Sequence, residues 1–237
     1  MIFNGIDFNN KLRILDLKKS LLPQIKNKYV DIPGKAGAKF MRNELSPISI
    51  NIKCELKGID KEDLENEYLQ LASELYTQEP AKLILNNSPE YYYLAILDDM
   101  TPIKEIRHFS IIDLSFLCLD PIKYSIDTIS LTDISNQELI NLGTRETKAI
   151  ITVTLNSDED NLKITLDNTG EYIYIEDNLE NGDVITIDLI ESKVLKNQDL
   201  IMEKVHFESD FFSIPPGPYK LISSSGVMDI EYQERWL

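Results

Sequence analysis

The sequence predicts a mainly β protein in two domains, an N-terminal α+β domain at residues 1–138 and an all-β domain at residues 139–237. Three observations predict this class. Residues 48–57 alternate between apolar and polar, as a half-buried strand does. Between residues 60 and 80, apolar side chains recur at helical spacing. From residue 149 onward, short β-type runs separated by turn residues follow one another, with no helix of normal length.

The segment before the alternating strand contains the turn signals Leu22-Pro23 and Ile32-Pro33-Gly34. Residues 34–38 are small, apart from Lys35, and they predict a loop or a hairpin tip. A phosphate-binding loop is disfavoured, because no strand, glycine-rich turn and helix with a Lys-Ser/Thr pair surround this stretch.

The predicted helix begins at Asp60, which is a good N-cap, and Asp63 lies in its first turn, where a negative charge favours the helix dipole. Pro80 ends the pattern. One face is apolar, so we expect an amphipathic helix that lies on a sheet. The apolar residues are Leu64, Tyr68, Leu71, Ala72 and Leu75.

Two β-rich runs follow the helix, residues 82–85 and 91–97, and the turn residues 86–89 between them predict a hairpin. In a strand, Tyr92 points away from Tyr91 and Tyr93, so the triplet forms no continuous stacking platform, and core or interface packing is expected. A second long strand is predicted from about Glu105 to Leu119, before Asp120-Pro121.

The polar, turn-rich stretches at residues 135–137 and 141–144 predict a linker, and the strands beyond them predict a β-sandwich or jelly roll. These strands are expected at residues 149–155, 162–166, 171–175, 183–189, 193–195, 219–222 and 227–232.

The net charge of −16 and a pI near 4.5 disfavour specific nucleic-acid binding and docking on an anionic membrane. The charge is unevenly distributed: the first 44 residues carry 9 basic and 4 acidic side chains, a net +5, whereas residues 141–237 carry 8 and 19, a net −11. This uneven distribution is explained either by a solvated surface with chance variation in charge or by two ends that face different partners. No apolar run approaches the ~20 residues of a membrane span, and no secretory signal is present.

No residues are predicted as catalytic, cofactor-binding or metal-binding, and the binding residues are left unknown. Carboxylate pairs such as Asp183/Asp188 and Glu176/Asp177 are unremarkable in a chain with 40 Asp and Glu. His108 and His206 are expected to be packed or surface histidines, and the acidic run at 158–160 does not have the spacing of an EF-hand loop. Cys54 and Cys118 are predicted to be reduced core thiols of a protein made in the cytoplasm.

A series of short turn and strand segments runs along almost the whole chain. The segments are Phe3-Asn4-Gly5-Ile6; Leu22-Pro23; residues 30–38 with Ile32-Pro33-Gly34; residues 82–85 and 92–95; Phe116, Cys118, Asp120-Pro121 and Tyr124; Asn141-Leu142-Gly143-Thr144; residues 181–188; residues 211–217; and the end at Glu231-Tyr232 and Arg235-Trp236-Leu237. No single segment is specific, but their order and spacing together resemble the distal tail protein family of long-tailed, non-contractile bacteriophages.

The resemblance implies an N-terminal ring domain with a β-sandwich, a hairpin and one helix, followed by a galectin-like β-sandwich. It implies a non-enzymatic, cofactor-free homohexameric ring at the virion tail tip. The implied partners are the tail-tube protein, a tail-associated lysin or spike protein, and receptor-binding proteins.

Two alternatives remain open. One is a lectin-like adhesion module that recognises host cell wall. A sugar site usually has an exposed Trp or Tyr with Arg, His and Asn beside it. The chain has one tryptophan, the penultimate Trp236, and its second half has only two arginines, Arg145 and Arg235, so this alternative is the weaker one. The other is an enzyme such as a wall-degrading glycosidase.

Overall fold

The computed structural model describes residues 1–106 and 109–237 and shows a mainly β protein with one long helix in the part that it describes. The chain divides into two compact units, Met1–Lys123 with Leu237, and Tyr124–Trp236. Compactness does not test which segments fold independently, so the boundary at residues 138/139 stays a prediction. We refer to the two parts as the first and second units.

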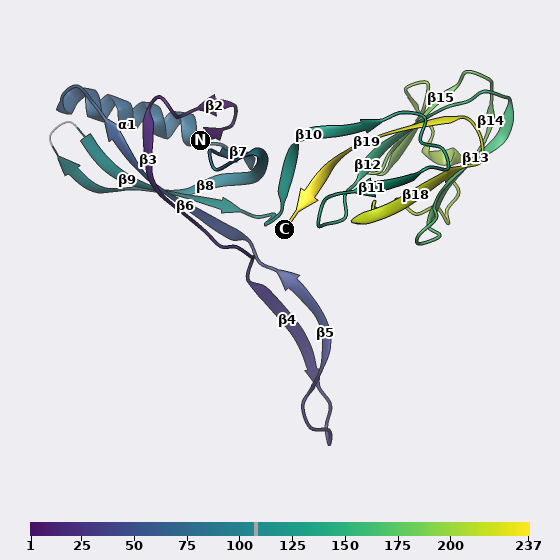
Figure 1. Ribbon diagram of the computed structural model, residues 1–237, viewed down its shortest axis with the longest axis horizontal. Coiled ribbons are helices and arrows are strands. Elements are labelled where there is room, and N and C mark those ends of the chain that lie inside the picture. Colours follow the sequence, from purple (N-terminus) through teal and green to yellow (C-terminus); the bar gives the residue numbers. More distant parts are fainter. Residues whose placement is uncertain (107–108) are drawn as a thin grey trace. The chain divides into compact units, whose positions relative to one another are not determined.

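An antiparallel sheet forms the first unit, and its central strands lie in the order β3-β6-β9-β8 (Figure 1). These strands span Leu12–Lys19, Ile48–Lys57, Phe109–Cys118 and Ser88–Ile106. Strand β8 continues into a second set of neighbours, β7-β1-β2, at Ala81–Leu85, Ile2–Phe3 and Ile6–Asp7. The predicted alternation in β6 is confirmed, since its even-numbered residues are buried.

Helix α1, Lys61–Leu75, buries Leu64, Leu71 and Leu75 in the same core as β6. The predicted N-cap is confirmed: the Asp60 carboxylate accepts a hydrogen bond of 2.9 Å from the backbone N–H of Asp63. The helix ends at Leu75, five residues before Pro80, because Tyr76 adopts an extended conformation. The apolar pattern therefore predicted where the helix lies, but it did not predict the residue at which the helix ends.

The predicted hairpin at residues 82–97 is confirmed as β7 and β8, although β8 begins at Ser88 and runs much further than expected. The predicted start of the next strand at Glu105 is wrong, since residues 105 and 106 still belong to β8 and β9 begins at Phe109. Bulges at 97/99 and 102/104 interrupt the pairing of β8 with β9. The second bulge accommodates Pro102, whose missing N–H would disrupt a regular ladder.

Strands β4, Ile25–Asp31, and β5, Ala38–Leu45, form a separate two-stranded sheet (Figure 1). In the sequence this hairpin lies between β3 and β6, which pair directly with each other. Residues 32–37 connect the two strands, which confirms the hairpin tip predicted around Gly34. All seven residues of β4 are exposed.

The second unit is a sandwich of two sheets, as predicted. One has the order β17-β16-β15-β12-β19-β10 and the other the order β11-β18-β13-β14. Their buried faces make one core cluster. The strands of the first sheet are Asp199–Leu200, Lys193–Lys196, Val184–Asp188, Ala149–Thr154, Val227–Trp236 and Lys123–Leu131. Those of the second are Glu138–Asn141, Gly217–Ser223, Glu159–Leu166 and Tyr172–Leu179.

The predicted linker at residues 135–144 is wrong in part, because it contains strand β11, which pairs with β18. Asn141 ends that strand and is 1% exposed. Its side-chain amide donates to the Pro215 carbonyl at 3.1 Å, and its side-chain oxygen accepts from the Gly143 N–H at 3.0 Å. The polar side chain of Asn141 is thus buried because a neighbouring N–H and a carbonyl distant in sequence satisfy its hydrogen bonds.

The only other helix within the described ranges is a single 3₁₀ turn, Met202–Lys204. Over those same ranges, the length and hydropathy needed to cross a bilayer are found in neither helix.

Candidate functional site

The carboxylates considered as catalytic candidates hold turns and ion pairs. Asp183 accepts hydrogen bonds from the Glu180 backbone N–H and the Asn197 amide, each at 2.8 Å, and these bonds lower the pKa of its carboxyl group. Asp188 accepts from the backbone N–H groups of Ile190 and Glu191, each at 2.9 Å. Such carboxylates are already occupied by structural hydrogen bonds.

The other acidic candidates are similar. Asp177 lies 3.5 Å from the Lys196 ammonium group, and Glu176 is exposed. Asp158 accepts a hydrogen bond of 2.8 Å from the Asn181 N–H, which anchors a turn. Within residues 1–106 and 109–237, no group of His, Cys, Asp and Glu side chains is arranged to hold a metal ion.

Both cysteines are buried, unpaired thiols in the first-unit core, as predicted. Burial raises the pKa of each thiol to about 12, so neither is a reactive thiolate near neutral pH. His108 lies outside the described residues. His206 lies at the surface of the second unit, beside Tyr174 and Phe207.

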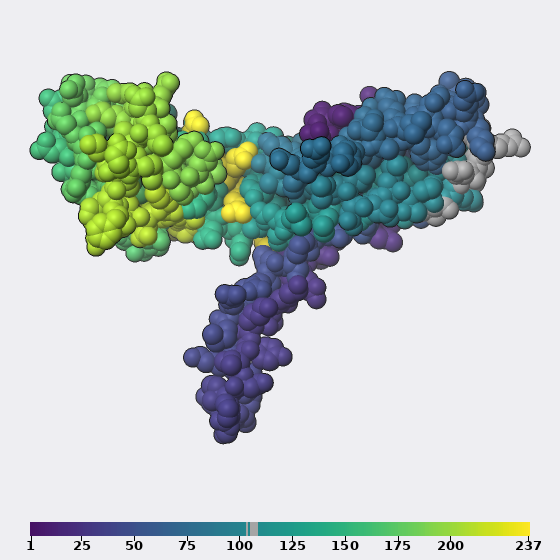
Figure 2. All heavy atoms as spheres, turned by 180° about the vertical axis from the view of Figure 1, so that it is seen from behind, coloured from purple at the N-terminus to yellow at the C-terminus, as the bar shows by residue number. Residues whose placement is uncertain are grey.

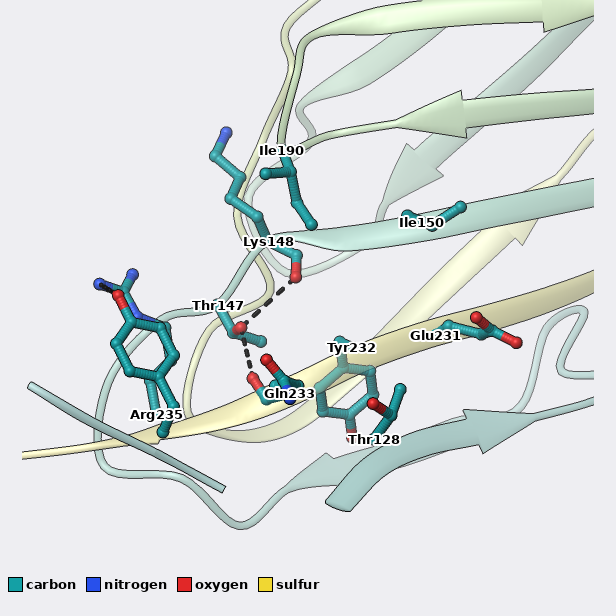
Figure 3. Close-up of a pocket in the computed structure, with 10 residues that line it drawn as sticks. Thr128, Thr147, Lys148, Ile150, Ile190, Glu231, Tyr232, Gln233 and Arg235 are labelled. Atoms are coloured by element: carbon teal, nitrogen blue, oxygen red, sulfur yellow. Dashed lines mark hydrogen bonds between the residues drawn. The ribbon is translucent and has the colours of Figure 1, made fainter. Parts of the chain in front are cut away.

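A pocket of about 480 Å³ opens on the second unit, between β10, β12 and β19 (Figure 3). Ile150, Ile190 and Tyr232 supply apolar walls, while Lys148 and Arg235 supply positive charge. The Thr147 hydroxyl donates to the Gln233 carbonyl at 2.6 Å, so it is engaged by the backbone. The Lys148 ammonium donates to the carbonyls of Phe211 and Phe212. These polar groups thus hold the residues that precede β12 against β19 and against residues 211–212.

Hairpin β4–β5 is an exposed arm of the first unit (Figure 2, purple). Tyr29 and Phe40 face each other across its two strands and are 67% and 59% exposed. Val30 and Met41 are exposed beside them. The hairpin also carries five basic side chains against two acidic ones: Lys26, Lys28, Lys35, Lys39 and Arg42 against Asp31 and Glu44. Exposed aromatic and methionine side chains are typical of a protein contact, and the positive charge around them favours an acidic partner.

The tyrosine triplet packs within the first unit, and this core packing is one of the two outcomes that the sequence left open for it. Tyr92 and Tyr93 are only 5% and 6% exposed, so they pack inside the first unit. A lysine lies over each ring: Lys123 over Tyr91 at 5.1 Å, Lys82 over Tyr92 at 4.5 Å and Lys19 over Tyr93 at 5.5 Å. Partial burial and the charge of Lys123 lower the pKa of Lys19.

Sequence reasoning missed the β4–β5 hairpin as an exposed surface. The available signal was the concentration of positive charge in the first 44 residues beside the turn at Ile32-Pro33-Gly34.

Two family models match the chain. One is described as the siphovirus-type tail component, C-terminal domain, and matches residues 142–236. The other is described as the phage tail protein RIFT-related domain and matches residues 6–118. Together they account for most of both units. Among curated protein sequences, none matches this chain.

Solved structures share the fold. The crystal structure of the Dit protein of phage SPP1, described as a paradigm of the hub adsorption apparatus in phages that infect Gram-positive hosts, aligns with a TM-score of 0.88 at 17% identity, over 100% of this chain and 98% of that chain. Two structures of the phage P2 baseplate in its activated conformation, with Ca and with Sr, align with TM-scores of 0.54 and 0.53 at 13% identity. They cover 97% and 96% of this chain and 91% of those chains.

Proposed function

The chain belongs to the siphophage distal tail protein family, a family of structural tail components, and from this membership we propose that it assembles into a hexameric ring at the tail tip. The ring connects the tail tube to the proteins that engage the host. On one side it contacts the tail-tube protein, and on the other a tail-associated lysin or spike protein, with receptor-binding proteins around it. It works by geometry, with no catalysed reaction and no cofactor.

The β4–β5 hairpin is the observation that carries the ring proposal. In a single chain its residues Tyr29, Val30, Phe40 and Met41 are exposed, which leaves apolar surface in water. A cyclic ring needs a heterologous contact in which one patch meets a different patch on the next copy. An extended arm reaches a neighbour without requiring the two sheets to pair, and it suits this geometry.

The uneven charge supports different roles for the two ends of the chain. Residues 141–237 carry a net charge of −11, which favours solubility. A subunit that is made in the host cytoplasm before it assembles needs this solubility. The first 44 residues, at net +5, suit contact with an acidic surface. We keep residues 1–138 and 139–237 as the proposed ring-forming and galectin-like domains.

Mass measurement of the purified chain by light scattering, over a range of concentrations, tests the proposal, together with negative-stain images. We expect a six-subunit species and ring-shaped particles with a central hole. A monomer at every concentration, with no rings in the images, would refute it.

The partners are tested by mixing the ring with purified tail-tube protein and, separately, with the tail-associated lysin. We expect each to bind the ring alone, and both together to form one ternary particle, because the proposed contacts are on opposite faces. Competition between the two would contradict the connecting role.

A further inference from the structure

One edge of the second unit carries an aromatic cluster that we define as Tyr172, Tyr174, His206 and Phe207. Tyr172 and Tyr174 are on β14, the edge strand of the sheet β11-β18-β13-β14. Residues 206–210 run along this edge. The His206 N–H donates to the Tyr174 carbonyl, and the Asp210 N–H to the Tyr172 carbonyl, both at 2.8 Å. Side chains distant in sequence are thereby brought to one place.

Phe207 lies at the tip of the turn between those two hydrogen bonds and is 87% exposed. The turn is fixed in place: the Ser209 N–H donates to the His206 carbonyl at 2.9 Å, and the Ser209 hydroxyl oxygen accepts from the Tyr174 N–H at 3.0 Å. A large apolar ring is therefore presented to solvent on a rigid support, and a rigid support lowers the entropy cost of binding.

The rings are contiguous. The centroids of Phe207 and His206 are 4.7 Å apart, and those of His206 and Tyr174 are 5.9 Å apart. Tyr172 lies beneath the Lys163 ammonium group, 4.1 Å from its centroid, and its hydroxyl donates to Glu208 at 3.4 Å.

Hydrogen-bonding groups surround the rings. His206 Nδ1 accepts from the Glu208 N–H at 3.3 Å, which places the ring N–H donor at Nε2. The exposed carboxylates of Glu208 and Asp210 are acceptors. This pattern, apolar ring faces bordered by donors and acceptors, matches a pyranose, which has a C–H face and a rim of hydroxyl groups.

Size and charge narrow the class of ligand. A stable protein interface buries roughly 800 Å² on each partner around an apolar centre, whereas here three adjacent rings, of which one is largely exposed, are enclosed by polar side chains. The neighbouring carboxylates and the net −11 of residues 141–237 disfavour an anionic polymer.

We propose that the aromatic cluster is a binding site for a neutral saccharide, with Phe207 stacking on the sugar ring and His206 and Glu208 bonding its hydroxyl groups. This site is additional to the ring function and does not depend on it. It gives the second unit a direct, weak contact with cell-surface polysaccharide, which several subunits of an assembly would strengthen by multivalency.

Saturation-transfer NMR and calorimetric titration of the full chain test the site. The probes are neutral oligosaccharides (the trimer of β-1,4-linked N-acetylglucosamine, and short glucose, galactose and rhamnose oligomers) and polyglycerol phosphate as an anionic polymer. The variants are Phe207→Ala and His206→Ala. The control is Ile140→Ala, an apolar residue that is 60% exposed on β11, the opposite edge strand of the same sheet.

We expect binding of at least one neutral oligosaccharide that changes little with salt. Phe207→Ala should weaken it about three- to tenfold, the range of a single aromatic contact, and Ile140→Ala should not. Phe207→Ala and Ile140→Ala should both unfold like the parent chain, because the two side chains are 87% and 60% exposed. Three results would overturn the proposal: no neutral sugar binding, binding unaffected by Phe207→Ala, or a Phe207→Ala defect confined to association with another tail protein. Salt-dependent binding of polyglycerol phosphate alone would also count against it.

Discussion

Replacing Phe40 with alanine tests the β4–β5 hairpin as the ring contact. Phe40 is 59% exposed in a single chain, so a neighbouring subunit can remove at most that share of the side chain from water. Full burial of a phenylalanine side chain is worth about 1.5–3 kcal/mol, which scales to about 1–2 kcal/mol per interface. That loss weakens each interface about 5- to 30-fold.

A closed hexamer has as many interfaces as subunits, so the effect on assembly is slightly larger than the effect on one interface. The concentration at which half of the chains are in rings should rise about 7- to 60-fold. Mass photometry or sedimentation velocity over a dilution series measures this concentration directly. Thermal unfolding of the dissociated subunit should change little, because Phe40 is outside both cores.

Two further variants separate assembly from hairpin stability. Phe40 pairs with Tyr29 across the strands, a contact worth roughly 0.2–1 kcal/mol to the hairpin itself. Met41 is 61% exposed and has no cross-strand partner in the register, so Met41→Ala should weaken assembly and leave the hairpin intact. Leu200→Ala, at a 60% exposed position of the second unit, is the matched control. Rings that form at the parental concentration in both hairpin variants would refute the reasoning.

Two other predictions concern the stability of the single chain. Gly226→Ala should destabilise the second unit by more than about 2 kcal/mol, because Gly226 has φ +78° and an added Cβ would lie 2.6 Å from the Thr154 carbonyl oxygen. Gly34 has φ +80° and open space around it, so Gly34→Ala should lower the free energy of unfolding by only about 1 kcal/mol. Equal losses of unfolding free energy in the two glycine variants, measured by urea unfolding, would contradict the steric argument. The pKa of both Cys54 and Cys118 is raised from 9.0 to about 12, so the folded state keeps protons that the unfolded state releases. These thiols should therefore not affect the free energy of unfolding below pH 9, and the free energy of unfolding should fall as the pH rises from 9 toward 12. The fall should be smaller in a variant with both Cys54→Ala and Cys118→Ala, and an identical pH dependence in that variant would contradict this. Iodoacetamide should alkylate the two thiols at pH 8 only after the chain has unfolded.

The elements that the sequence predicted well depend on local interactions. The alternation of Ile48 to Leu56 requires only that one face of a strand be buried, and β6 has the predicted residues inside. Asp60 caps α1 through a hydrogen bond to a residue three positions away. The turn residues between the short strands of the second unit similarly act within a few positions.

The elements that the sequence missed depend on partners far along the chain. Residues 135–137 and 141–144 are polar enough to suggest a linker, yet residues 138–141 form β11 because β18 lies beside them and Pro215 accepts a hydrogen bond from Asn141. For the tyrosines of β8 the sequence left core and interface packing open, and only the folded sheet decided that Tyr92 and Tyr93 are buried within the first unit, with Lys19 over the Tyr93 ring.

The two candidate surfaces, the β4–β5 hairpin and the aromatic cluster, were found only in the structure, whereas the fold class was predicted from the sequence. The sequence alone predicted a mainly β chain with one helix, a hairpin tip near Gly34 and opposite charge at its two ends, because composition, period and capping are carried by neighbouring residues. Only the tertiary structure decided that Tyr29 and Phe40 are exposed across from each other on an arm. It alone placed Phe207 and His206 beside Tyr174. Exposure and adjacency result from the packing of strands distant in sequence, and no local pattern records that packing.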